Sequence, residues 1–349
     1  MNSNANSLIQ SGIAGLIEGK DLTREQARDI MNAIMEGAAT QAQMGSLLTA
    51  LRIKGETVEE ITGFAEAMKG FGTPVATENS RLLDTCGTGG SGIHKTNIST
   101  TSAIIAAAAS VRVAKHGNRS ASGRTGSADV LEALGVNIHL DAEQAKRCLD
   151  EIGICFLFAQ LYHPSMKHAA GPRKELGVRT VFNVLGPLTN PARADRQLLG
   201  IYDRKKTGTL ALVLKELGLK RALVVSSYEG LDEISISGPT AVAELKDGEV
   251  KAYDITPEEL GLSRHPLEAI LGGGPEENAA IIRAVLGGEK TPYRDIVLAN
   301  SGACIYVAGL ADTLAEGVRK AADTIDSGAA ARKLEQLVAI TEELKHVSR

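Results

Sequence analysis

Two glycine-rich segments carry residues whose types suit a phosphate ligand. The first is Gly-Thr-Gly-Gly-Ser-Gly at 87–92, between an expected strand and an expected helix. There, backbone N–H groups can form a concave anion site, helped by the positive end of the helix dipole. The pattern is neither a Walker loop nor a G-x-G-x-x-G fingerprint. Taken alone, the segment fits phosphate binding and an ordinary glycine-rich turn equally well.

The second segment runs from Lys115-His-Gly-Asn-Arg119 through further hydroxyls and glycines to Ser127. It also follows an expected strand and opens a helix. Cations, hydroxyls and glycines together suit a multiply charged phosphate, with Lys115 as a point charge. Asn118 could offer a donor and an acceptor to a second, less charged substrate. A plain surface loop would hold fewer glycines and some acids before Asp129, so the segment favours phosphate binding.

Asp232 and Glu233 are adjacent carboxylates just after a buried strand at 221–226. A few carboxylates, completed by waters and substrate phosphates, are what Mg²⁺ takes in proteins. Alone, such a pair fits a solvated surface better. The two upstream phosphate segments reverse that preference and predict a magnesium site.

Arg173 is a candidate for binding a planar carboxylate, because a guanidinium can make two parallel contacts to it. The plainer interpretation from the residues alone is a helix-surface arginine paired with Glu175. His116, His163 and His168 lack metal-ligand spacing, so we expect structural or substrate-positioning roles for them.

Capping motifs and hydrophobic periodicity predict the helices and strands that position these residues. Thr23 with Gln26 and Thr57 with Glu60 form S/T-x-x-E/Q capping boxes, each followed by apolar residues at helical spacing. A helical N-terminal domain is expected to end near 70–74. The last seventy residues also have helical patterns.

Between these helical regions, short apolar strands alternate with helices, which predicts a largely parallel sheet covered on both faces. A hairpin is expected at 241–255, turning at Asp247-Gly248. The strands are expected at 81–86, 111–115, 136–139, 154–158 and 221–226, and the helices at 100–110, 127–134 and 142–152.

Composition excludes several classes of protein. The 349 residues carry 38 Lys and Arg against 42 Asp and Glu, a net charge of −4 that gives no general basic field for nucleic acid. The four cysteines form no C-x-x-C pair, and the N-terminus has no signal-peptide pattern. The longest apolar stretch, 103–111, is roughly half the length a membrane helix needs. We expect a cytoplasmic protein with no nucleic-acid or membrane partner.

Several long stretches, in order along nearly the whole chain, resemble the anthranilate phosphoribosyltransferase family of tryptophan biosynthesis. The most specific are Asp84-Thr-Cys-Gly-Thr-Gly-Gly90, Asn97-Ile-Ser-Thr100, Lys115-His-Gly-Asn-Arg119, Gly126-Ser-Ala-Asp129, Glu175-Leu-Gly-Val-Arg179 and Phe182-Asn-Val-Leu-Gly-Pro-Leu-Thr-Asn-Pro191.

The resemblance implies an α/β fold of the nucleoside phosphorylase and class IV phosphoribosyltransferase type. An N-terminal all-α domain would be hinged to a larger α/β domain with a mostly parallel central sheet. Residues 1–75 would form the helical dimerisation domain and 76–349 the donor-binding domain, with 161–190 returning to the helical part. The family is usually a homodimer. Domain closure is expected about hinges near 74–84 and 161–191.

The implied reaction transfers the phosphoribosyl group of 5-phosphoribosyl-1-pyrophosphate to the amine of anthranilate, releasing pyrophosphate, with Mg²⁺ as cofactor. No covalent nucleophile is needed. Gly87, Asn118 and Arg173 would contact anthranilate, with Arg173 on its carboxylate. Metal binding is implied for Ser99, Asp232 and Glu233. Substrate binding is implied for Gly87, Gly90, Ser91, Lys95, Asn97, Ile98, Ser99, Thr100, Lys115, His116, Gly117, Asn118, Arg119, Ser120, Ala121, Ser122, Gly123, Ser127 and Arg173.

Two departures from the family pattern lie in the first glycine-rich segment. Ser91 stands where the family usually has Asp, and Lys95-Thr-Asn97 replaces the usual Thr-Phe-Asn. One acid lost and one lysine gained make the segment more positive by two charges. We hypothesise that the donor phosphates are held at least as tightly, while the metal arrangement or turnover is altered.

Two alternatives stay open on the sequence. A pyrimidine nucleoside phosphorylase-like enzyme would share the fold and handle ribose phosphates, but Arg173 with Asp232 and Glu233 favours the transferase. A non-catalytic paralogue that binds nucleic acid or regulates a partner is suggested only by Ser91 and Lys95. The acidic net charge opposes nucleic-acid binding.

Overall fold

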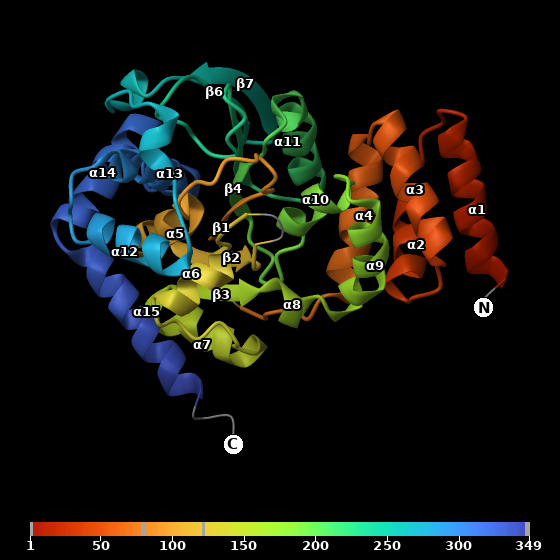
Figure 1. Ribbon diagram of the computed structural model, residues 1–349, viewed down its shortest axis with the longest axis horizontal. Coiled ribbons are helices and arrows are strands. Elements are labelled where there is room, and N and C mark those ends of the chain that lie inside the picture. Colours follow the sequence, from red (N-terminus) through yellow and green to blue (C-terminus); the bar gives the residue numbers. More distant parts are fainter. Residues whose placement is uncertain (1–2, 78–80, 121–122, 346–349) are drawn as a thin grey trace.

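The computed structural model describes residues 3–77, 81–120 and 123–345. A helical bundle lies at one end of the molecule and an α/β part at the other (Figure 1). The predicted fold class, an all-α N-terminal part joined to a larger α/β part, is confirmed.

Helices of the bundle begin at threonines that cap them. The predicted capping boxes at Thr23 and Thr57 are present, and a third lies at Thr40. The apolar faces of these helices bury residues such as Ile34 and Phe64. The bundle helices are α1 (Ser3–Ile17), α2 (Arg24–Met35), α3 (Gln41–Lys54) and α4 (Val58–Phe71), joined by α9 (Lys167–Leu176) and α10 (Phe182–Leu185).

The described strands form a seven-stranded sheet of order β3-β2-β1-β4-β5-β6-β7. Pairing is parallel from β3 to β5 and antiparallel from β5 to β7, so the predicted mostly parallel sheet is confirmed. The bounds are β1 (Leu82–Gly87), β2 (Arg112–Gly117), β3 (Ile154–Phe158), β4 (Arg196–Gly200), β5 (Arg221–Ser227), β6 (Thr240–Lys246) and β7 (Glu249–Ile255).

Alternating strand residues face the two sides of the sheet, as the period of two in a strand requires. Leu223 and Val225 of β5 pack under α13 (Pro292–Ala308), in a cluster to which α5 (Ile98–Ala108) also contributes. Residues of opposite parity pack under α7 (Ala142–Ile152) and α11 (Thr207–Glu216). The remaining helices are α6 (Ser127–Ala133), α8 (Ala159–Tyr162), α12 (Pro275–Leu286), α14 (Leu314–Asp326) and α15 (Ala329–Lys345).

Two predictions about strands were wrong. Residues 136–139 alternate in burial like a strand but join no sheet. The segment is held instead by α15, since the backbone N–H of Asn137 donates to Thr341 Oγ1 at 3.1 Å. The prediction also missed β4, which lies at the centre of the sheet.

The predicted hairpin at 241–255 is confirmed as β6 and β7. Asp247 and Gly248, between these strands, have φ of 53° and 78°. Positive φ at both positions is what a two-residue hairpin turn of this hand needs.

The predicted division of the chain at 75/76 stays a prediction. Helices α9 and α10 contact α2, α3 and α4, which is in keeping with the expected return of 161–190 to the helical part. The bundle shares one hydrophobic core with α11 and one face of the sheet, so the two parts meet over an apolar contact. Among the described residues, no helix combines the length and apolar character needed to span a membrane.

Candidate active site

The predicted site segments converge at the carboxyl ends of the parallel strands. β1 leads into the glycine loop, defined here as residues 88–97, and then into α5. β2 leads into a second loop, 118–126, and then into α6. The strand order reverses between β1 and β4, and at such a switch point α/β sheets form a crevice for ligands.

Asp232 lies directly against the ends of β1 and β4. Gly87 and Gly200, the last residues of those strands, pair in register. A Cβ on Gly87 would overlap the Asp232 carboxylate, and one on Gly200 would overlap its backbone carbonyl. The N–H of Gly89 donates to Asp232 Oδ2 at 2.9 Å. Gly87 was predicted as a site residue, but Gly200 was not, because its strand β4 was not predicted from the sequence.

Lys95 of the glycine loop lies between the two predicted metal-binding carboxylates. Its Nζ is 2.7 Å from Asp232 Oδ1 and 2.9 Å from Glu233 Oε1. The side chains of Asp232 and Glu233 are only 2% and 5% exposed, against 17% for Lys95. Burial lowers the pKa of Lys95, but attraction to both carboxylates outweighs it and raises the pKa overall. Burial raises the pKa of Glu233, with Lys95 opposing that shift.

The donor set of Asp232 and Glu233 fits a hard divalent cation, because carboxylate oxygens are the ligands such ions prefer. Ser99, the third predicted metal residue, lies on the first turn of α5 and accepts a hydrogen bond from Lys115. Within residues 3–77, 81–120 and 123–345, no group of three His, Cys, Asp or Glu could hold a metal by itself. Any metal there would therefore need hydroxyl, water or phosphate oxygens as well.

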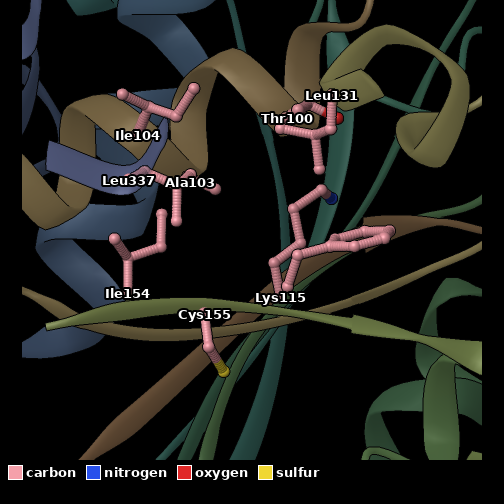
Figure 2. Close-up of a pocket in the computed structure, with 9 residues that line it drawn as sticks. Thr100, Ala103, Ile104, Lys115, Leu131, Ile154, Cys155 and Leu337 are labelled. Carbon is pink, nitrogen blue, oxygen red and sulfur yellow. The ribbon is translucent and has the colours of Figure 1, made fainter. Parts of the chain in front are cut away.

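Lys115 is held at the end of β2 by two oxygen acceptors. Its Nζ donates to the Thr85 carbonyl at 2.6 Å and to Ser99 Oγ at 3.3 Å. Figure 2 shows its side chain rising from the strand toward Thr100, beside an apolar pocket that includes Ala103 and Ile104. Lys115 is itself one of the residues that line this pocket, and its ammonium reaches Ser99 at the start of α5.

The first turns of α5 and α6 are linked at the site. Thr100 Oγ1 donates to Ser127 Oγ at 3.1 Å. Asn97 Nδ2 donates to the Thr125 carbonyl at 3.3 Å. Ile98 is fully buried, so only its backbone can face a ligand. The structure thus places two predicted helix N-termini side by side.

Asp129 links two backbone N–H groups of the second loop, and Arg119 of this loop is paired with acidic side chains. Asp129 Oδ2 accepts from the N–H groups of Ser120 and Gly126 at 3.1 and 2.8 Å. Arg119 pairs with Asp129 and with Glu132, at 2.9 and 2.5 Å. Its charge is therefore less available to a phosphate than the sequence suggested.

Other predicted residues take varied positions around these loops. Gly90 has φ of 80°, and Ser91 Oγ accepts from the Ile93 N–H at 3.3 Å. Asn118 is exposed and its Oδ1 accepts from Gln160 Nε2 at 3.3 Å. Gly117 ends β2 and Gly123 is exposed; Ala121 and Ser122 lie outside the described residues.

His116 turns its ring away from the loops. Its ring packs on that of His163 with centroids 5.2 Å apart, while the backbone N–H of His116 donates to the buried Asp84 carboxylate. Burial, aided by His163 and Lys115, lowers the pKa of His116 to about 3. The imidazole is therefore neutral and structural at ordinary pH.

Arg173 does not pair with Glu175, so the plainer interpretation from the sequence was wrong. Its guanidinium lies 5.2 Å from the centroid of the Phe182 ring, and no ion pair to it is found within the described ranges. Burial lowers its pKa. A half-buried guanidinium over an aromatic ring suits a planar aromatic carboxylate.

Two further residues support the site and were not predicted. Arg179 stacks on Tyr202, 3.9 Å from the ring centroid, and donates to the Gly90 carbonyl. Asn278, buried in α12, donates to Asn97 Oδ1 at 2.9 Å and accepts from the Gly273 N–H at 2.9 Å. The only signal for Arg179 was its place in the Glu175–Arg179 motif; Asn278 had none.

Two family models match the chain in the order of its two parts. The "Glycosyl transferase family, helical bundle domain" matches residues 10–72, and the "Glycosyl transferase family, a/b domain" matches residues 79–331. A relative from Brevibacillus brevis, named anthranilate phosphoribosyltransferase, is 53% identical over 98% of this chain and 100% of its own length. The chain belongs to the anthranilate phosphoribosyltransferase family. The resemblance carried by the sequence motifs is thereby confirmed.

Solved structures of anthranilate phosphoribosyltransferases agree with this placement. The Thermus thermophilus protein is 46% identical, with a TM-score of 0.91 over 95% of this chain and 99% of its own. The Saccharomyces cerevisiae protein, solved in complex with PRPP and Mg, is 28% identical, with a TM-score of 0.89 over 98% and 99%. Another structure of the yeast protein is in complex with 4-fluoroanthranilate.

Proposed function

We propose that this chain transfers the phosphoribosyl group of 5-phosphoribosyl-1-pyrophosphate to the amine of anthranilate, giving N-(5-phosphoribosyl)anthranilate and pyrophosphate. The observation that carries the proposal is the meeting of two glycine-rich loops and a buried carboxylate pair at one switch point. The names of relatives about half identical over nearly the whole chain support it and do not favour the phosphorylase or non-catalytic alternatives.

Donor binding falls to groups at the ends of β1 and β2. The glycine loop offers backbone N–H groups, Lys115 offers a fixed ammonium, and Ser99, Thr100 and Ser127 offer hydroxyls. Phosphate oxygens accept hydrogen bonds from all of these. The predicted roles of these residues remain part of the proposal.

Acceptor binding falls to Arg173. The guanidinium above Phe182 would bind the anthranilate carboxylate through parallel hydrogen bonds. Holding the carboxylate fixes the direction of the neighbouring amine, which is a positioning contribution to the rate.

Mg²⁺ is proposed as the cofactor, in line with the yeast relative solved with PRPP and Mg. Asp232, Glu233 and Ser99 are the residues that would hold it. When bound, the ion would neutralise negative charge on the departing pyrophosphate.

The bond changes need no covalent intermediate with the protein. The ribose C1–O bond to pyrophosphate breaks as C1 gains positive character, and the amine nitrogen bonds to C1 and loses a proton. The four cysteines are all buried, and burial raises the pKa of the Cys86 thiol. Burial of this kind disfavours a thiol nucleophile.

Loss of anthranilate fluorescence on adding phosphoribosyl pyrophosphate and Mg²⁺ tests the proposal, with EDTA as control. We expect metal-dependent loss in the natural chain and none in Asp232→Ala/Glu233→Ala. No loss from a folded protein that still binds the donor would contradict the proposal.

A homodimer through the helical part and a cytoplasmic location complete the proposal. Ile17 on α1 and Ile53 on α3 are 73% and 82% exposed, and α1 packs against α3. Large exposed apolar side chains on neighbouring helices favour an interface. Light scattering after size-exclusion chromatography should give twice the chain mass, and Ile53→Glu should lower it.

A further inference from the structure

Lys95 holds a position that a divalent cation would need. We infer that its ammonium is a built-in competitor for the metal: it neutralises Asp232 and Glu233 without donor, and it leaves them when metal and donor bind together. The inference rests on the proposed metal site and adds a mechanism by which metal and donor binding become coupled.

The Lys95 ammonium contacts one carboxylate oxygen of Asp232 and one of Glu233. Its Nζ contacts Asp232 Oδ1 at 2.7 Å, Glu233 Oε1 at 2.9 Å and the Asp232 carbonyl at 3.4 Å. The N–H of Gly89 takes the other carboxylate oxygen of Asp232. A magnesium ion bound to these oxygens would sit at about 2.0–2.1 Å from them. Two cations cannot share so small a space, because like charges repel.

The ammonium can leave because it ends a flexible side chain, although the Lys95 backbone itself is held by a β-bridge to Leu271. The glycine loop contains Gly89, Gly90 and Gly92 at positive φ. Lys95 is 17% exposed, and its four-carbon stem has several rotamers. Asp232 and Glu233, by contrast, are buried and fixed. We therefore expect the Lys95 side chain to move when metal binds, while the two carboxylates stay in place.

Once released, the ammonium remains on the loop proposed to bind the donor. It would exchange two carboxylates for donor phosphates, so no buried charge is left unpaired. Metal binding without donor must break the lysine contacts with no such replacement. Metal affinity should therefore be low alone and higher with donor, and the same coupling should act on donor affinity.

Direct metal binding, measured without donor, tests the inference. Calorimetric titration with Mn²⁺ should give about tenfold tighter binding for Lys95→Met than for the natural chain, because the competing charge is gone. Lys251→Met, which removes an exposed lysine from edge strand β7, is the matched control and should leave the affinity unchanged. Equal Mn²⁺ affinity in Lys95→Met and the natural chain overturns the inference.

Folding of the variant is checked by thermal unfolding. Lys95→Met leaves two buried carboxylates without their cation, so its midpoint should be lower and should rise more with added Mg²⁺ than that of the natural chain. A Mg²⁺-induced rise no larger than that of the natural chain speaks against competition.

A measurement on the natural chain covers the case in which the variant does not fold. Acetylation of Lys95 by an N-hydroxysuccinimide ester, followed by mass spectrometry, should be slow without metal and faster at saturating Mg²⁺. Lys251 should react at one rate throughout. An unchanged rate at Lys95 overturns the inference.

These readouts separate the inference from the proposed function. Fluorescence-detected turnover with no change in metal affinity would overturn only the role of Lys95. A tighter Mn²⁺ site in Lys95→Met, together with no turnover in the natural chain, would overturn only the proposed transferase activity.

Discussion

At the residue scale, Asp232 reaches its position because two glycines on adjacent strands leave room for it. The register that pairs Gly87 with Gly200 puts both beneath one aspartate. A side chain on either would push the carboxylate out of line with Glu233. The position of Asp232, a proposed metal ligand, therefore depends on the absence of side chains at the ends of the two strands.

Gly200→Ala should displace Asp232, since its Cβ would overlap the Asp232 carbonyl. We expect turnover to fall about a hundredfold, because small misplacements have effects of that size. Overpacking should also lower the free energy of unfolding by about 1–3 kcal/mol. Steady-state kinetics and urea unfolding measure both.

Gly208→Ala is the control for this substitution. Gly208 lies in α11, and a Cβ added there would have nothing within 4 Å, so stability should hold or rise slightly through helix propensity. Natural turnover in Gly200→Ala would show that Asp232 tolerates the overlap.

Arg173→Gln should weaken acceptor binding selectively. Loss of a charged hydrogen-bond donor from the anthranilate carboxylate is expected to raise the anthranilate KM about 10- to 100-fold. The donor KM should change little. Lys174→Gln, at the next and exposed position, should behave like the natural chain. Equal effects on both substrates would place Arg173 outside the acceptor site.

Residue types and motif spacing were enough to single out Lys115, Asp232 and Glu233 as candidate site residues. They were not enough to predict that Lys95 pairs with those acids. That pairing spans 137 and 138 residues of sequence and depends on the path of the glycine loop. Contacts of that kind can be predicted only when the strand order is known.

At the scale of elements, α12 acts as a brace for the glycine loop. Asn278 lies in the first turns of α12. Its side-chain amide donates a hydrogen bond to Asn97 and accepts one from the Gly273 N–H. The helix thereby fixes the last residue of the glycine loop against the start of α5.

Asn278→Ala should leave buried polar groups of Asn97 and Gly273 unpaired. The expected loss in the free energy of unfolding is about 1–3 kcal/mol, with a raised donor KM because the loop loosens. Urea unfolding and donor-dependent kinetics measure these effects. Glu276→Gln, exposed in the same turn, is the control. A stability loss with unchanged donor KM would mean that the brace supports folding alone.

Elements with strong local signals were predicted well. Capping boxes placed the starts of α2 and α4, and α7 and β3 match their expected bounds. β4 escaped because its five residues include Arg196 and Gln197, and no periodicity stands out. The segment 136–139 misled because alternating burial also occurs where an extended chain crosses a helix. Whether β4 and the segment 136–139 join the sheet depends on the strands available to pair with them, and local sequence does not show those partners.

At the scale of the whole molecule, a histidine pair lies close to where the sheet meets the bundle. His116 is on β2, and His163 follows α8 and faces Gly72 at the end of α4. Both rings are buried, and burial lowers the pKa of each. The contact between the sheet and the bundle at these two histidines, called the seam here, is therefore stable only while both imidazoles remain neutral.

Acidification should weaken the fold through these histidines. With the folded-state pKa of His116 lowered from 6.5 to about 3, the unfolded chain binds a proton between those values that the folded chain excludes. Stability is thus fully present above pH 6.5 and is lost as pH falls through that window. Asp84 acts in the opposite direction, since burial raises its pKa from 3.8 to about 6 and the folded chain takes up its proton first.

A variant separates the histidine contribution from that of Asp84. Between pH 7 and 5, His116 alone should remove about 2 kcal/mol from the free energy of unfolding. In His116→Gln the fall over that interval should be smaller by this amount, measured by urea unfolding at both pH values. His139→Gln removes an imidazole that is 57% exposed and should leave the pH dependence unchanged. An identical fall in His116→Gln and the natural chain would mean that the seam admits a charged imidazole, because water or a carboxylate then reaches it.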